Sequence, residues 1–217
     1  MLKSAAVFLA CGSIALCAQA QGFKFSNPPP GAQAEAQAQR DASVGAQLAT
    51  PCRERIKNRK IMVLIGQETN GVVAAGQGPF SRHVEAVNTR LQGLGLKTYS
   101  PEQIRKQIAQ EEIDAYFKND PDRALSASRR MAAQYVLRGV IASRAVRNPM
   151  VNVNQVSVNM NFTLTDAAGR PVSTAAASNE SYAGSDTSGM ALTLIEERAD
   201  EVVAKLYSDY CRNAASK

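Results

Sequence analysis

Histidine is scarce in this sequence, and tryptophan is absent: the 217 residues include one histidine, His83. A structural zinc site takes four ligands, usually cysteine and histidine, so a single histidine argues against one. A catalytic triad needs a recognisable nucleophile motif besides its histidine, and none occurs here. We therefore expect His83, near the start of the first helix, to be a surface or helix-start residue. We predict no catalytic residue, no metal site, no cofactor and no enzyme activity.

Motifs that bind phosphate, calcium or nucleic acid are missing or incomplete. Gly66 to Gly71 has the glycine spacing of a phosphate-binding loop, but Val72 and Val73 replace its lysine and hydroxyl residue. Gly76 to Ser81 is an incomplete dinucleotide fingerprint, and no DxDxDG calcium loop occurs. Nucleic-acid binding would need a basic cluster interleaved with aromatic residues, which the sequence does not contain. We expect no nucleic-acid partner.

No hydrophobic run is long enough to cross a bilayer comfortably. Lys3 precedes an apolar run, Ala5 to Cys17, and Ala18-Gln19-Ala20 follows it as a cleavage signal. This pattern predicts that residues 1–20 are a secretory signal peptide; a retained anchor is the alternative. A large leucine before Cys17 disfavours lipid attachment. We expect a mature chain without a transmembrane span, in the periplasm of a Gram-negative bacterium or secreted.

Only four cysteines occur, and two of them, Cys11 and Cys17, lie in the predicted signal peptide. The remaining two, Cys52 and Cys211, most simply form a disulfide in an exported protein. A nucleophilic cysteine would need a nearby base, and nothing in the sequence marks one. The bridge would join the first and last elements of one domain, which stabilises the fold by at most about 5 kcal/mol.

The chain carries a net charge of +6, or +5 once Lys3 is removed with the signal peptide. This mild positive charge favours acidic partners, either an envelope protein complex or an acidic envelope surface. Three arginines follow or interrupt one predicted strand, and we consider them candidates for partner binding, with plain solvated charge as the alternative: Arg138, Arg144 and Arg147.

The residues after the signal peptide predict a tether followed by one domain. Residues 21–51 are rich in proline, alanine and glutamine, and they lack an apolar stripe, although their composition permits a helix. We predict a tether over residues 21–51, a single domain over residues 52–213 and a tail over residues 214–217. The length of that domain suits one hydrophobic core.

The first half of the domain alternates strands and helices. Lys60 to Gly66 predicts a strand buried on both faces. The glycine-rich segment after it, Gly66 to Gly78, is expected to be a loop that is mobile or waits for a partner. Its candidate binding residues are Gly66, Glu68, Asn70, Gly71, Gly76 and Gly78. A helix with apolar residues from Val84 to Leu94 and a short strand, Leu96 to Tyr99, follow.

The second half begins with helices and ends in a meander. Ser100 and Gln103 form a capping box for a helix through Ile113, and Asp120 caps another helix. Strands follow over Tyr135 to Val146, through the alternating residues Val156 to Thr165, and over Pro171 to Tyr182; a helix with an apolar stripe ends the domain. The order β-α-β-α-α-β-β-β-α predicts an α/β (α+β) fold, a mixed sheet with a C-terminal antiparallel meander and helices packed on it. The meander is expected to leave an edge strand that can accept another chain.

Three segments resemble a family of periplasmic domains. AAQYVLRGVIAS (132–143), the hairpin VSVNMNFTLTDAAGRPVSTAAASNESY (156–182) and KTYSPEQIRKQI (97–108) resemble the superfamily of the curli-secretion component, the activator lipoproteins of penicillin-binding proteins and the flagellar assembly protein T, with an architecture similar to the N-terminal domain of TolB. The resemblance implies a mixed α/β sandwich and a non-enzymatic adaptor of the envelope. It carries over no binding residue, and no pore-forming amphipathic hairpin is present.

Two functions follow as hypotheses. The first is a non-enzymatic periplasmic accessory protein for a flagellar, secretion or cell-wall assembly, which acts by protein–protein interaction. The alternative is a small-ligand or glycan-binding protein or a hydrolase that uses the segment Gly66 to Gly78. The sequence does not decide whether the domain forms a homo-oligomer.

Overall fold

The computed structural model describes residues 31–79, 81–118, 120–182 and 185–215. The predicted signal peptide and the start of the predicted tether lie outside the described residues. The helices are α1 (Ala32–Leu48), α2 (Arg53–Ile56), α3 (Ser81–Gly93), α4 (Pro101–Gln107), α5 (Gln110–Phe117), α6 (Pro121–Arg130) and α7 (Thr187–Ala215). The strands are β1 (Lys60–Thr69), β2 (Val72–Ala74), β3 (Lys97–Thr98), β4 (Tyr135–Asn148), β5 (Val153–Asp166) and β6 (Pro171–Tyr182).

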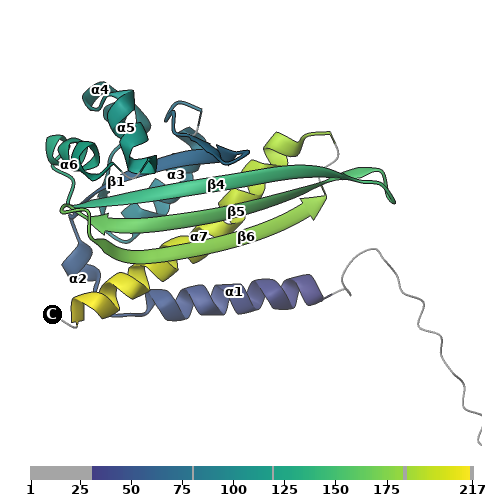
Figure 1. Ribbon diagram of the computed structural model, residues 1–217. Coiled ribbons are helices and arrows are strands. Elements are labelled where there is room, and N and C mark those ends of the chain that lie inside the picture. Colours follow the sequence, from purple (N-terminus) through teal and green to yellow (C-terminus); the bar gives the residue numbers. More distant parts are fainter. Residues whose placement is uncertain (1–30, 80, 119, 183–184, 216–217) are drawn as a thin grey trace, which may run out of the picture.

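The six strands form one mixed sheet in the order β2-β1-β4-β5-β6, with β3 also paired to β1 (Figure 1). β1 runs parallel to β3 and β4, whereas β4, β5 and β6 form an antiparallel meander. The predicted fold class, a mixed sheet that ends in an antiparallel meander, is therefore confirmed.

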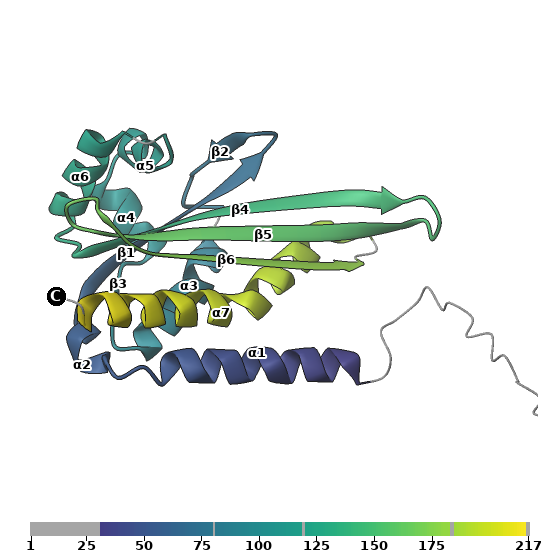
Figure 2. The same ribbon diagram turned by 60° about the horizontal axis from the view of Figure 1, so that its bottom comes forward.

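Helices cover the two faces of the sheet unequally. α3 and α7 pack against one face, and α4, α5 and α6 pack against the other face at the end where β1 and β4 begin (Figures 1 and 2). Along β5 the side chains alternate between buried apolar residues and more exposed polar ones, as the sequence predicts. The polar side chains of β5 lie on the face where no described helix covers β5 or β6.

The core consists of two apolar clusters separated by the sheet. Ile61, Val63 and Ile65 belong to the cluster under α3 and α7, whereas Met62 and Leu64 belong to the one under α4 to α6. All five side chains are at most 2 % exposed, so the prediction of a strand buried on both faces is confirmed. This double burial anchors β1 at the centre of the fold.

The glycine-rich segment after β1 is not the loop that the sequence analysis expects. β1 continues to Thr69, and a two-residue turn, Asn70-Gly71, leads into β2, which pairs antiparallel with β1. Both turn residues have positive φ values, 53° and 79°, as the tight hairpin requires. The prediction of a loop over the whole segment is therefore wrong, because an Asn-Gly hairpin folds back on the sheet.

The single helix expected after Ser100 is divided into α4 and α5. Ile108 has an extended backbone, and Ala109 N donates to Glu112 Oε2 at 3.1 Å to start a new helix. The predicted capping box is present: Gln103 N donates to Ser100 Oγ at 3.2 Å and Ser100 N donates to Gln103 Oε1 at 2.8 Å. The predicted helix start is therefore confirmed, and the predicted helix end is wrong.

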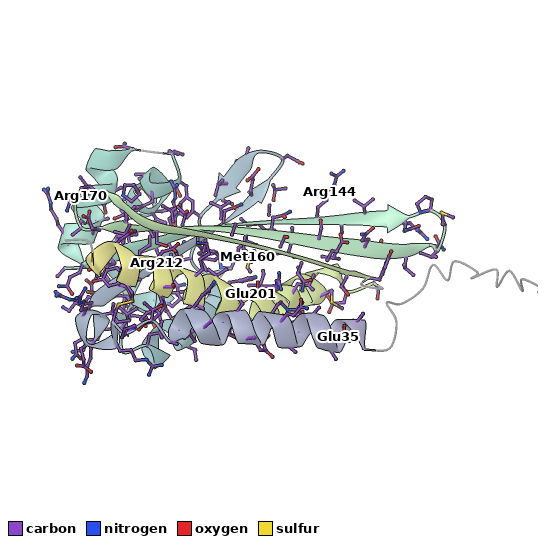
Figure 3. The ribbon with its side chains drawn as sticks, turned by 90° about the horizontal axis from the view of Figure 1, so that it is seen from below. Glu35, Arg144, Met160, Arg170, Glu201 and Arg212 are labelled. Atoms are coloured by element: carbon purple, nitrogen blue, oxygen red, sulfur yellow. A yellow bond between two sulfur atoms is a disulfide. The ribbon has the colours of Figure 1, made fainter. Side chains whose placement is uncertain are left out.

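α1 occupies most of the described part of the predicted tether. It lies alongside α7, where Arg40 Nε is 3.6 Å from Glu201 Oε1 (Figures 1 and 3). None of its residues is buried, which explains why the sequence shows no apolar stripe. Whether residues 21–51 serve as a tether stays a prediction.

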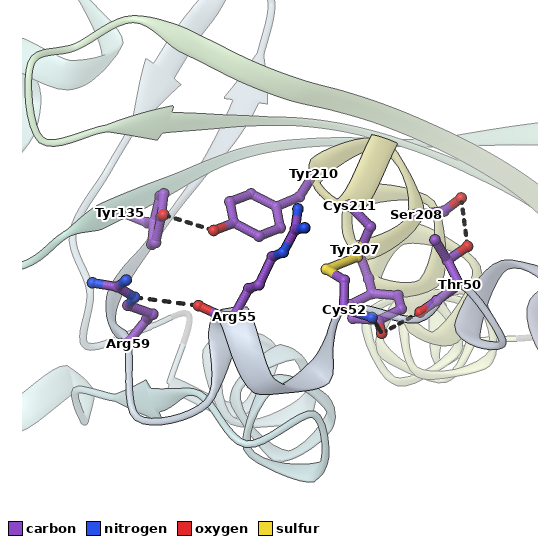
Figure 4. Close-up of a disulfide and its surroundings, with 9 residues drawn as sticks. All are labelled: Thr50, Cys52, Arg55, Arg59, Tyr135, Tyr207, Ser208, Tyr210 and Cys211. Carbon is purple, nitrogen blue, oxygen red and sulfur yellow. Dashed lines mark hydrogen bonds between the residues drawn. A yellow bond between two sulfur atoms is a disulfide. The ribbon is translucent and has the colours of Figure 1, made fainter. Parts of the chain in front are cut away.

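The end of the fold where β1 and β4 begin, called here the proximal end, carries the predicted disulfide. Cys52 and Cys211 are bonded, with their Cα atoms 5.6 Å apart (Figure 4). Beside them Tyr207 Oη donates to the carbonyl oxygen of Thr50 at 2.6 Å and accepts from Cys52 N at 3.3 Å. The bridge and these hydrogen bonds fix the chain before β1 to the C-terminal part of α7.

Candidate interaction surface

The hairpin of β4 and β5 extends well beyond the rest of the sheet (Figures 1 and 2). β1 pairs with β4 only as far as Ala142, whereas β5 pairs with β4 to its last residue, Asn148. The segment from Ser143 to Asn154 therefore projects with β5 as the only strand beside β4. We call this projecting part of the molecule the distal hairpin.

The turn at the tip of the distal hairpin is held by its own side chains. Asn148 Oδ1 accepts from Met150 N at 3.0 Å, and Asn148 O accepts from Asn152 N at 2.9 Å. Arg147 Nε donates to Asn152 Oδ1 at 2.8 Å. Because asparagine side chains satisfy the turn, the backbone that presents Met150 and Val151 is pre-organised.

Exposed apolar side chains are concentrated at this tip. Among the described residues the large apolar side chains that are exposed number six, and Val72 is the only one away from the distal end. Met150 is 89 % exposed and Val151 is 54 % exposed. Clustered exposed apolar side chains mark interaction sites more often than scattered ones do. The five at the distal end are Val146, Met150, Val151, Val153 and Tyr182.

Two arginines add positive charge to this apolar cluster. The segment from Ser143 to Asn154 contains Arg144 and Arg147 and no acidic residue. Figure 3 shows the Arg144 side chain directed away from α1 and α7. On the neighbouring strand β6, Glu180 is acidic, and its Oε2 accepts from Gln155 Nε2 at 3.3 Å. We define the distal surface as Arg144, Val146, Arg147, Met150, Val151, Val153 and Tyr182.

A cleft of about 610 Å³ opens at the base of the distal hairpin, between β4 and the first residues of α3 and α7. Its apolar wall includes Leu192 and Ile195, and its polar groups include Arg82 and His83. At its floor Gln67 Nε2 donates to Ser143 Oγ at 3.1 Å. A cleft of this size and mixed polarity is large enough for a small ligand.

His83 lies in the first turn of α3, in agreement with the predicted helix-start position, and it is half-buried at this cleft. Burial lowers the pKa of His83, and the positive charge of Arg82 lowers it further, while Glu196 acts in the opposite direction. The imidazole is therefore neutral at pH 7 and presents one nitrogen donor and one acceptor. A neutral imidazole at the wall of a cleft can form a hydrogen bond with a polar ligand.

The glycines proposed for partner binding have structural roles or lie apart from the tip. Gly66 lies within β1, where an added Cβ would approach Val73 Cγ1 to 2.7 Å and the Phe117 ring to 3.0 Å. Gly71 forms the β1–β2 turn beside Asn70. Gly76 and Gly78 lie in the connection from β2 to α3.

The remaining candidate binding residues lie in different parts of the sheet. Glu68 is exposed near the end of β1, opposite Ala142 of β4. Arg138 Nη1 donates to the carbonyl oxygen of Tyr116 at 2.7 Å, so this arginine holds the end of α5 against the sheet. Arg144 and Arg147 alone among the predicted site residues belong to the distal surface. The structure therefore does not bring the nine candidates together, and their role in binding stays a prediction.

Sequence reasoning missed the apolar residues of the tip. Met150 and Val151 follow Pro149 and stand among asparagines, where a turn is expected to be polar. Two large apolar residues in a polar turn are therefore a signal that was available in the sequence. Gln77 was also missed, since its buried position depends on β1 and is invisible in the local pattern.

Other kinds of site are not found in the part of the chain that the structure describes. No three histidine, cysteine or acidic side chains gather there in a way that would hold a metal ion. Within the same residues no helix combines the length and the apolar character that a membrane crossing needs.

No family model matches the sequence, and no curated protein is similar to it in sequence. Similar solved structures include a dodecamer of a PelC variant from Paraburkholderia phytofirmans, with 20% identity and a TM-score of 0.42 over 67% of this chain and 88% of that chain. Lipoprotein GNA1162 from Neisseria meningitidis has 12% identity and a TM-score of 0.42 over 66% of this chain and 96% of that chain. The C-terminal domain of LpoB from Escherichia coli has 14% identity and a TM-score of 0.32 over 60% of this chain and 93% of that chain. Because the sequence identities and TM-scores are low, these similarities carry no conclusion about function.

Proposed function

We propose that this chain is a non-enzymatic accessory protein of a cell-envelope assembly and that it binds a protein partner through the distal surface. The observation that carries the proposal is the concentration of exposed apolar side chains at one end of the molecule. Removing apolar area from water is favourable by roughly 25 cal/mol per Å², before the entropic and desolvation costs of association are subtracted.

The charge of the distal surface indicates the chemistry of that partner. Arg144 and Arg147 both lie on β4 beside the apolar residues, and no acidic residue lies between Ser143 and Asn154. A complementary surface would have an apolar centre and acidic groups at its rim, because opposite charges steer association and fix orientation. An acidic envelope protein fits this description.

The proposed location is the periplasm. The N-terminal pattern of a signal peptide supports export, and the Cys52–Cys211 disulfide suits an oxidising compartment. Under this proposal the bridge keeps the domain folded outside the cytoplasm, while the distal hairpin makes the contact.

In-cell photo-crosslinking tests the proposal. A photoreactive amino acid is placed at Val151, or at Val72 as the matched control, since Val72 is an exposed valine on the other hairpin. We expect the probe at Val151 to capture one envelope protein, identified by mass spectrometry, and the probe at Val72 not to capture it. Equal capture at both positions, or none at Val151, would contradict the proposal.

A lipid surface is the alternative acidic partner, and it is distinguished by a separate assay. The purified chain is mixed with vesicles of phosphatidylcholine alone or with added phosphatidylglycerol, and co-sedimentation is measured. Binding to the anionic vesicles that is lost in the Met150→Asp variant would assign the distal surface to lipid instead of protein.

The cleft at the base of the distal hairpin favours a second candidate function, binding of a small ligand or glycan. A panel of metabolites and glycans is screened for an increase in the melting temperature of the chain. An increase that disappears in Ser143→Trp, which narrows the cleft at Ser143, would support this function. No increase across the panel would argue against it.

A further inference from the structure

The two sides of the sheet differ in whether their edge backbone groups have hydrogen-bond partners within the chain. At the β1 edge, Lys60 and Ile61 pair with β3, and the residues from Gln67 to Thr69 pair with β2. Between them the side chain of Gln77, which is 1 % exposed, takes the place of a strand. This side of β1 is therefore covered at Lys60 and Ile61, at Ile65 and from Gln67 to Thr69.

The contacts of Gln77 show how the backbone groups of Ile65 are satisfied at this edge. Gln77 Oε1 accepts from Ile65 N at 3.3 Å, and Gln77 Nε2 donates to the carbonyl oxygens of Ile65 at 3.0 Å and Ala75 at 2.6 Å. A side-chain amide can mimic a backbone amide because it offers the same donor and acceptor.

The β6 edge has no comparable cover. β6 is twelve residues long and pairs with β5, and no described strand pairs with its other side. Natural edge strands are usually short, carry lysine or proline, or contain bulges that prevent pairing. β6 has proline only at its first position, one charged residue, Glu180, and a register shift only near its start, opposite Leu164 and Thr165.

The backbone of β6 is oriented to accept another strand. Asp166 N donates to the carbonyl oxygen of Arg170, so the backbone groups of Asp166 point toward β6. Leu164 is two residues away on the same strand, so its backbone groups point toward β6 as well. Ser173 lies opposite Leu164 and faces β5. The alternate residues then direct their N–H and C=O groups outward. These residues are Thr174, Ala176, Ser178 and Glu180.

Side chains already bond the backbone at the two ends of this edge. Near the start of β6 the carbonyl oxygen of Val172 accepts from Asn213 Nδ2 at 2.7 Å. Near its end Glu180 N donates to Asn179 Oδ1 at 3.0 Å. The stretch that an added strand would use for backbone pairing is therefore Thr174 to Ser178.

The helical layer extends past this edge. Figures 1 and 2 show α1 beyond β6, on the side away from β5. None of the residues of α1 is buried, although helices in proteins gain most of their stability from packing. A strand added beside β6 would lie over α1 and would cover part of its surface.

The side chains beside the edge carry negative charge that no basic group balances among the described ion pairs. Glu180 Oε2 accepts from Gln155 Nε2 at 3.3 Å, and Glu197 Oε2 accepts from Asn179 Nδ2 at 3.1 Å. Both donors are neutral amides. A basic side chain directly opposite Glu180 on an added strand would form a favourable cross-strand pair.

We propose that the outer edge of β6 binds an extended segment of a partner protein as an additional strand, and that this segment carries a lysine or arginine opposite Glu180. The interaction is β-strand addition, in which backbone hydrogen bonds supply affinity and alternate side chains supply specificity. The proposal does not rest on the distal surface, which is a separate docking site.

The test uses a library of random twelve-residue peptides displayed on phage and selected against the full chain. We expect the enriched peptides to alternate in polarity, to contain lysine or arginine and to lack internal proline. The most enriched peptide is then synthesised, and hydrogen exchange of the backbone is measured with and without it. We expect the peptide to slow exchange of the amides of Thr174, Ala176 and Ser178.

Two variants and a control locate the interaction. Ser178→Pro removes one outward N–H, and we expect peptide affinity to fall at least about tenfold; Ser178→Ala keeps the N–H and should leave affinity nearly unchanged. Glu180→Lys is expected to weaken binding about threefold or more through like-charge repulsion. It also serves as the second test if Ser178→Pro does not fold.

Three outcomes would overturn the proposal. The first is a library that yields no peptide able to bind the purified chain, and the second is a bound peptide that protects amides outside β6. The third is a dimer of the free chain in sedimentation whose outward β6 amides already exchange slowly, which would make a second copy the occupant. None of these outcomes bears on crosslinking at Val151, so failure here is distinguishable from failure of the proposed function.

Discussion

The proximal and distal ends of the sheet differ in how their side chains are used. At the proximal end Cys52 and Cys211 are bonded, and the hydroxyl groups of Tyr135 and Tyr210 lie 3.0 Å apart (Figure 4). At the distal end the side chain of Met150 extends into solvent. One end therefore concentrates bonds within the chain, and the other exposes apolar groups to solvent.

Under the proposed function, stability and recognition are therefore separated along the strands. Changes at the proximal end should alter the free energy of unfolding, whereas changes at the distal end should alter binding. Surface residues that make few contacts contribute little to stability, which leaves them free to be selected for recognition.

Removing the disulfide should produce the largest loss of stability. We expect Cys52→Ser/Cys211→Ser to lower the free energy of unfolding by about 2–5 kcal/mol, because the bridge closes a long loop in the unfolded chain. Chemical denaturation of the two proteins measures the change, and the wild-type chain in reductant is the control. A loss below about 0.5 kcal/mol would mean that the proximal end does not depend on the bridge.

Replacing Gln77 should have the next largest effect. We expect Gln77→Leu to lower the free energy of unfolding by about 1–3 kcal/mol, because the buried backbone groups of Ile65 lose their hydrogen-bond partners. Gln39→Leu, on the exposed side of α1, is the matched control and should change stability little. Equal melting temperatures for the two variants would contradict the edge-covering role of Gln77.

Asp209, at the proximal end, should make a smaller contribution to stability that depends on pH. Burial raises the pKa of Asp209, but hydrogen bonds from Lys205, Arg212 and Ser173 outweigh this and lower the pKa overall. The stabilisation is therefore present above the unfolded pKa of about 3.9 and is lost as the pH falls through the lower folded pKa. Acid unfolding measured from about pH 6 to about pH 2 should be less steep in Asp209→Asn, and identical curves would contradict this.

Changing the distal tip should have the smallest effect on stability. We expect Met150→Asp to change the free energy of unfolding by no more than about 0.5 kcal/mol, because the Met150 side chain is almost fully exposed. The melting temperature should therefore stay close to that of the wild type. Val72→Asp is the exposed control. Marked destabilisation by Met150→Asp alone would show that the tip is part of the folding unit.

Much of the fold could be predicted because its signals are local. The box of Ser100 and Gln103 marks a helix start in four residues, and strict alternation marks β5. The turn at Asn70-Gly71 was missed, although an Asn-Gly pair between apolar residues favours a hairpin. The high glycine content of the same segment favours a loop instead, and the two signals conflict.

The candidate site was less predictable because it depends on tertiary structure. Arg138 and Arg144 lie on the same predicted strand, yet one holds α5 and the other reaches the distal surface. That difference arises where β1 stops pairing with β4, at Ala142. No local sequence pattern shows where β1 stops pairing with β4. No local pattern shows that the side chain of Gln77 is buried against β1 either.

The most direct test of the account is partner capture by distal and control variants of equal stability. Met150→Asp/Val151→Asp and Val72→Asp are expressed in cells, fixed with a chemical crosslinker and recovered, and the co-purified envelope proteins are quantified by mass spectrometry. We predict that the distal double variant loses the partner that the wild type and Val72→Asp retain. Retention of the same partner by the distal double variant would contradict the claim that the distal surface is the docking site.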